Sequence, residues 1–415
     1  MTMMKYSMKI RGLMARYASA FRHDYARRAA DLRAHGVFVR MRGSRGFVLV
    51  IVFLMITLLV SVSSEFFITA VTNMHYKRGF DQKLKAWTLA KAGTALCAYI
   101  LDADKKGGSS SIMQGASSNS AVDSYQDLWA LNFPEIPLEY GDLKLRINDE
   151  NSKINLSVLG TEVVDRTPYY SITQRFFLNM GLPMDLADCL LDWVDLDDSR
   201  SPYGAESSDY YLTLPSPYHA KNREMDSIQE MLLVRGITPE IYYGLGDPPV
   251  NETNLVDDNR GNQNLDAAAV EKFAPGNKGL AEKTMSFKGL ERPIGKERSR
   301  RLSDYFRVHG DRTDYLSDLN KININTASYR VLSALTDTMT DDIVTELVRR
   351  RQQKPFETVD EIKDLVPDDT FRKNHLSVRS FIFRIDSTGT VNDTEVTIVA
   401  VYNRDTKKYY YVGEQ

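Results

Sequence analysis

The chain has 415 residues with a formal net charge of −2 at pH 7, and 43% of them are hydrophobic. Its length predicts two or three domains. Residues 1–46 hold eleven Lys and Arg against two Asp and Glu, which leaves a net charge of about −11 for the rest. That acidic remainder argues against general attraction to nucleic acid or anionic lipid. Cys97 and Cys189 are the only cysteines. They are too few for a disulfide scaffold, and whether they pair stays open.

A membrane-length apolar segment follows the basic head. From Phe47 to Ser64 there are eighteen residues without a charge, about the minimum for a helix that crosses a bilayer. Arg40, Arg42 and Arg45 precede this segment, so its N-terminal side should remain cytoplasmic. The bulk of the chain should therefore lie on the far side of the membrane.

Three interpretations of this segment are open. They are processing between Gly46 and Phe47, an uncleaved membrane anchor, and an ordinary secretory signal peptide. Signal-peptide cleavage follows small residues such as Ala-x-Ala, which Val62-Ser63-Ser64-Glu65 matches poorly. We therefore favour processing after Gly46.

The Gly46-Phe47 junction resembles the leader of type IV pilin-like proteins. The resemblance implies cleavage by a prepilin peptidase, which would make Phe47 the mature N-terminus. Two features depart from the pilin pattern. Ile51 stands at the fifth mature position, where pilins carry Glu, and the leader is long. Translation from Met41 would give a leader of only six residues.

A helical pattern continues beyond the apolar segment. Small and apolar residues recur at three- and four-residue steps, at Ala86, Leu89, Ala90, Gly93, Leu96, Cys97 and Ile100. This spacing predicts one helix from Phe47 to about Asp102 that packs against a small sheet. The Gly- and Ser-rich stretch Lys105–Ser120 predicts a flexible loop.

Strand patterns flank a long helical region. The predicted strands are Leu143–Ile147, Lys153–Leu156, Val378–Ile385, Val391–Tyr402 and Lys408–Val412. Residues from about 165 to 370 instead have a helical pattern. The simplest topology is an antiparallel sheet domain whose chain is interrupted by a large helical insertion.

The insertion contains a faint internal repeat. Lys153–Ser157 and Lys321–Thr326 have similar sequences, and each precedes a set of helices. Met225–Leu232 and Phe356–Lys363 then form a second similar pair, both predicted as short helices. The repeat predicts two helix-hairpin-helix or sterile-alpha-motif-like bundles, joined by long loops at about 246–310.

A cluster of acidic residues is the best candidate for a site. Six carboxylates lie within eighteen residues, at Asp192, Asp195, Asp197, Asp198, Glu206 and Asp209. Such charges repel one another unless they are solvated or bridged by a cation, and calcium takes six to eight oxygen ligands. The spacing does not match an EF-hand. From composition alone, both a solvated acidic loop and a calcium site remain open.

Several segments together carry a family resemblance. They are Leu190–Asp198, Gly204–Glu206, Asp209–Tyr211, Leu233–Gly244 and Ile322–Ala327. With the Gly46-Phe47 junction and Ile51, their order resembles the minor pseudopilin K family of type II secretion systems. The resemblance runs from about residue 43 to the C-terminus, is weakest in 246–310 and is absent in 1–40.

The resemblance implies an α+β, type IV pilin-like fold. A long N-terminal transmembrane and spine helix would pack on a small antiparallel sheet, with an inserted all-α domain of two helix-hairpin-helix or SAM-like bundles. The implied divisions are a leader (1–46), the transmembrane part of the helix (47–68), a first pseudopilin part (69–160), the insertion (161–375) and a second pseudopilin part (376–415).

The resemblance also implies a function. The chain would be a single-pass bacterial inner-membrane protein with its bulk in the periplasm. It would cap the pseudopilus tip with minor pseudopilins I and J, with H beneath, and would initiate assembly of the major pseudopilin G on the inner-membrane secretion platform for export of folded proteins. A tip subunit has no neighbour above it, so Ile51 can replace a costly intramembrane charge.

Calcium in the inserted domain is part of the same resemblance. We expect Asp195, Asp197, Glu206 and Asp209 to be the ligands, with Asp192 and Asp198 secondary. Asp192 belongs more naturally to the preceding helix. If the same carboxylates acted in glycoside hydrolysis, two of them would have to lie at a defined separation across a sugar cleft. The sequence gives no means of judging that separation. No nucleophile elbow or zinc motif is present, so we expect no enzyme activity.

Two alternatives to this function remain. One is a minor pilin of a type IV pilus, which would share the leader. The other is a membrane-anchored helix-hairpin-helix protein that binds DNA through the region that begins at Asn323. Its hairpin position, Leu335–Asp342, has no glycine and three acids, which would repel phosphate. Arg349, Arg350 and Arg351 are the basic residues nearby. We therefore expect no nucleic acid partner.

Overall fold

The computed structural model describes residues 45–106, 121–130, 133, 135–161, 166–244 and 301–415. Most of the predicted leader with Met41, most of the predicted loop at 105–120, and the loops at 246–300 lie outside these residues. The chain divides into two units, residues 1–77 and 78–415. Helix α2 (Arg45–Lys105) is continuous for 61 residues, as the sequence predicts.

The N-terminal part of α2 exposes its apolar side chains. Phe47, Leu49 and Phe53 are 46%, 73% and 68% exposed. Among the described helices, α2 is the one whose length and composition suit a membrane span. Its backbone groups bond within the helix, which is the condition for a helix to cross a bilayer.

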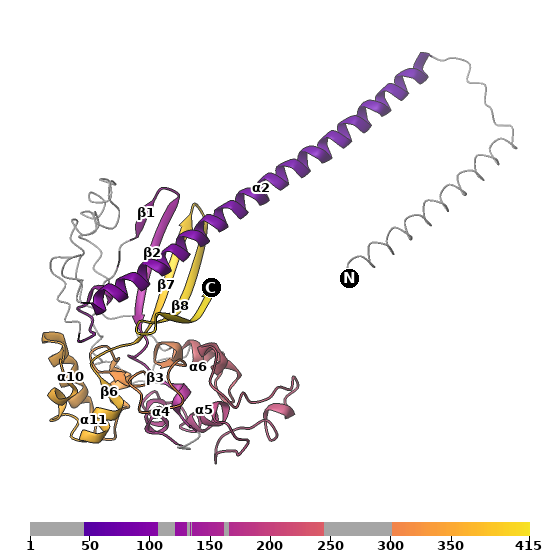
Figure 1. Ribbon diagram of the computed structural model, residues 1–415. Coiled ribbons are helices and arrows are strands. Elements are labelled where there is room, and N and C mark those ends of the chain that lie inside the picture. Colours follow the sequence, from indigo (N-terminus) through magenta and orange to yellow (C-terminus); the bar gives the residue numbers. More distant parts are fainter. Residues whose placement is uncertain (1–44, 107–120, 131–132, 134, 162–165, 245–300) are drawn as a thin grey trace. The chain divides into compact units, whose positions relative to one another are not determined.

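A five-stranded antiparallel sheet packs against the C-terminal part of α2 (Figure 1). The strands, in spatial order, are β1 (Ile136–Leu138), β2 (Gly141–Asp149), β7 (Ile382–Val391), β8 (Thr394–Asn403) and β9 (Lys408–Glu414). Small residues allow close contact, since a Cβ at Gly389 would lie 2.2 Å from the Ala86 carbonyl oxygen. Ala86, Ala90 and Cys97 are fully buried, as the helical spacing predicts.

The insertion enters and leaves on neighbouring strands. β2 ends at Asp149, β7 begins at Ile382, and the two strands pair along their length. The predicted strand at Val378 therefore starts four residues later than expected. Val378 itself lies in the segment that returns from the insertion, where its carbonyl accepts a hydrogen bond from the Asp123 amide.

The insertion is built of short helices and two small parallel strand pairs. Its first half holds β3 (Ile154–Asn155), η2 (Leu156–Val158), α4 (Pro168–Asn179), α5 (Leu186–Val194), η3 (Tyr211–Thr213), η4 (Ile228–Leu233), α6 (Pro239–Tyr243), η5 (Leu302–Asp304) and β4 (Phe306–Arg307). The second half holds β5 (Ile322–Asn323), α9 (Tyr329–Ser333), α10 (Asp341–Gln353), η6 (Val359–Ile362), α11 (Asp369–His375) and β6 (Leu376–Ser377). A shared hydrophobic core joins both halves.

The repeated sequences adopt similar local structures. β3 pairs in parallel with β4, and β5 pairs in parallel with β6. Both predicted short helices are 3₁₀ helices that begin with a capping box, Ser227 with Glu230 in η4 and Thr358 with Glu361 in η6. The sequence predicted a short helix at each place without giving its type. The structure thus mixes helices with an antiparallel sheet, in agreement with the predicted α+β class.

Candidate metal centre

Helix α5 places two carboxylates one turn apart on the same side. Asp188 and Asp192 are separated by four residues and are 3% and 0% exposed. The loop after α5 folds back over them. The Tyr203 amide donates to Asp188, and the Ser201 amide lies 3.1 Å from both oxygens of Asp192.

Three of the predicted acids meet beneath this loop. Carboxylate oxygens of Asp192, Asp195 and Glu206 lie within 4.8 Å of one another, and all three residues are buried. We call these three residues the metal group. Gly204 is needed for the approach, because a Cβ there would lie 1.9 Å from Oδ2 of Asp192.

Glu206 has a carboxylate oxygen with an open bonding position. It is 1% exposed, and its Oε1 is buried without a hydrogen-bond partner among the described residues. Its Oε2 accepts from the Ser207 amide at 3.3 Å. A buried carboxylate oxygen without a donor is costly unless a cation or a proton meets it. This oxygen is the observation that fits the group to a metal ion.

The electrostatics of the metal group point the same way. Burial, followed by the charge of Asp192, raises the pKa of Glu206 to about 7. Burial also raises the pKa of Asp192. Two nearby guanidinium groups face acids outside the metal group, since Arg200 pairs with Asp209 at 2.9 Å and Arg166 lies 3.6 Å from Asp188. Three acids that share one small volume create a field that favours a divalent cation.

Comparison with known proteins shows which family the chain resembles. Two models, both described as "Type II secretion system (T2SS), protein K", match residues 152–246 and 322–379. The chain is 27% identical over 218 residues to the type II secretion system protein K of Aeromonas hydrophila, covering 49% of this chain and 62% of that protein. The chain is therefore similar to protein K of type II secretion systems in both halves of the insertion.

Further relatives agree with this assignment. A putative type II secretion system protein K of Escherichia coli K12 is 23% identical over 210 residues, covering 48% of this chain and 60% of that protein. The chain thus spans about three fifths of the curated relatives that it matches. A chain in the crystal structure of the GspK-GspI-GspJ complex from enterotoxigenic E. coli shares the fold. That match has a TM-score of 0.53 and 19% identity, and it covers 83% of this chain and 99% of the other.

The metal group lies within the first protein K family match and differs from the ligand set that we expected. Asp195 and Glu206 are members, and Asp192, expected as secondary, is the third. Asp192 does sit in α5, but its carboxylate faces the loop. The four-residue spacing from Asp188 and the Gly at 204 were signals in the sequence for this arrangement.

The other predicted acids organise the loop. Asp209 accepts from the Glu206 amide at 2.9 Å and pairs with Arg200. Asp197 accepts from the Ser199 amide at 2.6 Å, and Asp198 accepts from Asn222 at 2.7 Å. These contacts hold the loop in the shape that brings Asp195 and Glu206 together.

The three arginines of α10 are engaged within the chain. Arg349 bonds Glu346, and Arg350 bonds Glu346 and Asp364. Arg351 is buried and donates to the carbonyls of Ile324 and Ala327. All three arginines therefore have partners within the chain.

Proposed function

We propose that this chain is a non-enzymatic minor pseudopilin, the K subunit of a type II secretion system. The observation that carries the proposal is the match to protein K family models in both halves of the insertion. In this role it caps the tip of the periplasmic pseudopilus and initiates its assembly for export of folded proteins across the outer membrane. The bulk of the chain is periplasmic, and α2 anchors it in the inner membrane.

The proposed partners follow from the same family. The matched crystal structure is of a GspK-GspI-GspJ complex. We propose that minor pseudopilins I and J are the neighbours of this chain at the tip, with H beneath them. The major pseudopilin G and the inner-membrane platform would then extend the fibre.

The fold proposed for this role is pilin-like. A long helix against an antiparallel sheet supports it, as do the paired α9 and α10 of the second half and α4 and α5 of the first, which we assign to two SAM-like bundles. The domain limits proposed from sequence place the insertion at 161–375. A bulky insertion at one end of the sheet would block addition of a further subunit, so head-to-tail assembly would stop there.

The N-terminus has two proposed roles in assembly. A prepilin peptidase would cut between Gly46 and Phe47 and leave Phe47 as the first residue. Ile51, which is 42% exposed on α2, would then lie in the membrane without a charge. Since no subunit lies above a cap, there is no amine for a carboxylate at this position to meet.

We also propose that the metal group binds calcium. Asp192, Asp195 and Glu206 would supply carboxylate oxygens, which are ligands that calcium prefers, and backbone carbonyls and water would complete its shell. The ion would neutralise the buried charge and fix the loop after α5. It would have a structural role and no catalytic one.

N-terminal sequencing of the mature protein tests the assignment. We expect a chain that begins at Phe47 in cells with prepilin peptidase and an uncut precursor in cells without it. Isolation of the wild-type chain should also yield I and J from the first strain. A chain that retains Arg45 in both strains would leave a simple membrane anchor and contradict the pseudopilin assignment.

A further inference from the structure

A tight turn after η4 places Arg235 against the loop that follows α5. The Ile237 amide donates to the Val234 carbonyl at 3.1 Å, and Gly236, at the third position of this turn, has a φ of +84°, as a type II turn requires. Val234 and Ile237 are 3% and 4% exposed, so both ends of the turn are fixed in the core. A Cβ at Gly236 would lie 2.7 Å from Cδ2 of Leu186, which shows that the turn lies directly against α5. Packing therefore sets the position of the Arg235 backbone.

Arg235 contacts the loop after α5 at three points. Its Nη1 donates to the Gly204 carbonyl at 3.1 Å, and its guanidinium carbon lies 5.1 Å from the centre of the Tyr210 ring. Its backbone amide donates to the Tyr211 hydroxyl at 3.2 Å, and Tyr211 is fully buried. Arg235 comes from Leu233–Gly244, one of the segments that carry the family resemblance. Its contacts connect that segment with the loop that supplies two members of the metal group.

Asp188 of α5 holds the same part of the loop. Its Oδ2 accepts from the Tyr203 amide at 3.2 Å, and its Oδ1 accepts from the Tyr170 hydroxyl of α4. The loop is thus bound to α5 at the amide of Tyr203 and to Arg235 at the carbonyl of the next residue, Gly204. This stretch of two residues is therefore held at both of its ends.

Gly204 lies directly against the Asp192 carboxylate. A Cβ at this position would be 1.9 Å from Oδ2, 2.5 Å from Cγ and 2.9 Å from Oδ1, so the backbone there touches the whole carboxyl group. The Ser201 amide lies 3.1 Å from both oxygens of the same carboxylate. Glu206 follows Gly204 by two residues in the chain. A displacement of Gly204 would therefore change the positions of Asp192 and Glu206 relative to Asp195.

We propose that Arg235 is a positioning residue of the metal group, which holds Gly204 against Asp192 so that the three carboxylates face a single calcium ion. The inference rests on the calcium site proposed above. Arg235 carries a positive charge, and a positive charge near an anionic site by itself opposes the binding of a cation. Any gain in calcium affinity from Arg235 must therefore come through the geometry of the loop. Charge and geometry thus predict effects of opposite sign when Arg235 is replaced.

Calcium titration of the full chain in detergent micelles, by isothermal titration calorimetry, tests this role. Arg235→Met removes the donor to the Gly204 carbonyl and keeps an apolar stem against Tyr210. We expect calcium affinity to fall by about tenfold, as for other residues that orient metal ligands. Removal of the positive charge alone would raise the affinity. An affinity that is unchanged or higher in Arg235→Met would overturn the proposal.

A conservative variant shows whether the hydrogen bond to Gly204 is the cause. Arg235→Lys keeps the charge and a donor but lacks the planar guanidinium group, so its calcium affinity should lie between those of the wild type and Arg235→Met. If Arg235→Met does not fold, Arg235→Lys decides alone. An affinity of Arg235→Lys equal to that of the wild type would then refute the positioning role.

Arg223→Met is the matched control for charge. It removes the same charge from the same half of the insertion, where the Arg223 side chain is 67% exposed and lies 3.9 Å from Asp226. Calcium affinity should not fall in this variant. A loss as large as that in Arg235→Met would show a general effect of the substitution and would contradict a specific role of Arg235.

A double variant tests whether Arg235 acts through Gly204. Gly204→Ala and Arg235→Met displace the same stretch of backbone, so the combined loss in calcium affinity should be smaller than the product of the two single losses. Gly204→Ala combined with Arg223→Met should show the loss of Gly204→Ala alone. If the losses of Gly204→Ala and Arg235→Met multiply in full, Arg235 does not act through Gly204 and the proposal is wrong.

The wild type and Glu206→Gln, titrated in the same series, separate this inference from the calcium site itself. We expect binding in the wild type and its loss in Glu206→Gln. Absence of binding in the wild type would refute the calcium site and the role of Arg235 together. Binding that is lost in Glu206→Gln but unchanged in Arg235→Met would keep the calcium site and refute the role of Arg235 alone.

Discussion

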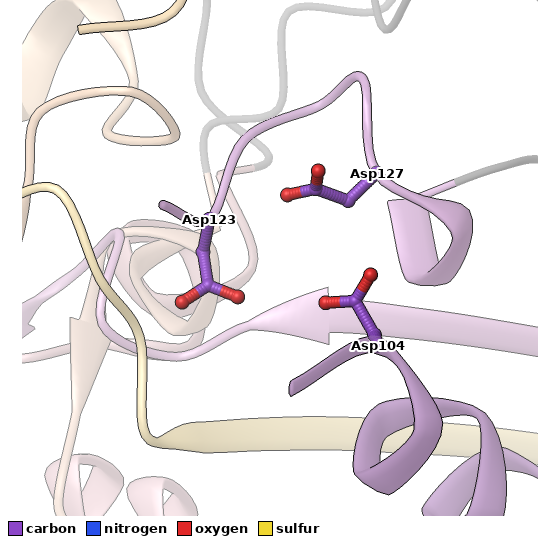
Figure 2. A group of neighbouring side chains, drawn as sticks. All are labelled: Asp104, Asp123 and Asp127. Carbon is purple, nitrogen blue, oxygen red and sulfur yellow. The ribbon is translucent and has the colours of Figure 1, made fainter. Parts of the chain in front are cut away.

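The metal group and a second group, formed by Asp104, Asp123 and Asp127 and called the strap group (Figure 2), each contain three buried carboxylates, but they differ in the groups beside them. The strap group has Arg404, whose guanidinium bonds both oxygens of Asp123. In the metal group, Glu206 keeps a buried oxygen without a hydrogen-bond partner among the described residues. The strap group bonds a cation of the chain itself, whereas the metal group has an oxygen that is open to an added cation or a proton. Carboxylate clusters of equal size can therefore have different chemistry, set by a single neighbour.

Removal of Arg404 should have the largest effect. Arg404→Met leaves Asp123 buried without its cationic partner, and we expect a loss of about 3–5 kcal/mol in the free energy of unfolding. Urea unfolding followed by tryptophan fluorescence measures it. Lys105→Met breaks a half-exposed pair with Asp405 and should cost at most about 1 kcal/mol. Equal costs for the two variants would contradict the buried role of Arg404.

Calcium should stabilise the protein through the metal group. At a calcium concentration of 100 times Kd, we expect a gain of about 2.7 kcal/mol over the protein in EDTA. Glu206→Gln should lose this gain, whereas Asp127→Asn in the strap group should keep it. Thermal unfolding with calcium and with EDTA makes the measurement. A calcium response that disappears in Asp127→Asn instead would reverse the assignment of the two groups.

A glycine substitution tests the geometry of the metal group without removing a charge. Gly204→Ala places a Cβ 1.9 Å from Asp192 Oδ2, so the carboxylate must move. We expect calcium affinity to fall by about tenfold, or about 1.4 kcal/mol, as measured by isothermal titration calorimetry. Gly79→Ala is the matched control, because nothing lies within 4 Å of its Cβ position on α2. Unchanged affinity in Gly204→Ala would place the ion elsewhere.

The pH dependence of stability should give the most specific effect. In EDTA, the raised pKa values of Glu206, about 7, and of Asp127, about 8, make the free energy of unfolding fall as the pH rises from 5 to 8. Glu206→Gln should remove the part of this decrease in the free energy of unfolding that occurs below pH 7. Asp127→Asn should remove a part that extends to pH 8. Calcium should suppress only the Glu206 part. A free energy of unfolding that rises with pH over this interval would show that neither acid has a raised pKa in the folded protein.

The sequence predicted the metal group in part and the strap group not at all. Asp192, Asp195 and Glu206 lie close together in the chain, so the density of carboxylates reveals them. Asp104 lies at the end of α2, Asp123 and Asp127 lie in residues 121–130, and Arg404 lies almost 300 residues further on. No pattern within a short stretch of sequence can predict a contact that depends on tertiary packing.

The same distinction explains the fold predictions. The apolar segment, the helical spacing around Ala90 and the C-terminal strands are local patterns, and they are present in the structure. The partner of β3 is not local, since β3 lies soon after β2 in sequence but pairs with β4. The 3₁₀ geometry at Ile228–Leu233 and Val359–Ile362 also escaped prediction, because capped short turns share residue preferences with α-helices.

The pairing of β2 with β7 has a mechanical consequence. Asp149 and Phe383 are direct partners, so the insertion is attached to two adjacent strands at the same end of the sheet. A force that pulls on the insertion would act on β2 and β7 at the same time, along the direction of the two strands. The ten residue pairs between β7 and β8 would then be loaded in shear, with their hydrogen bonds resisting together rather than opening one by one. Because Gly389 of β7 lies against Ala86 of α2, tension applied to the insertion would be transmitted to α2 while the sheet stays intact.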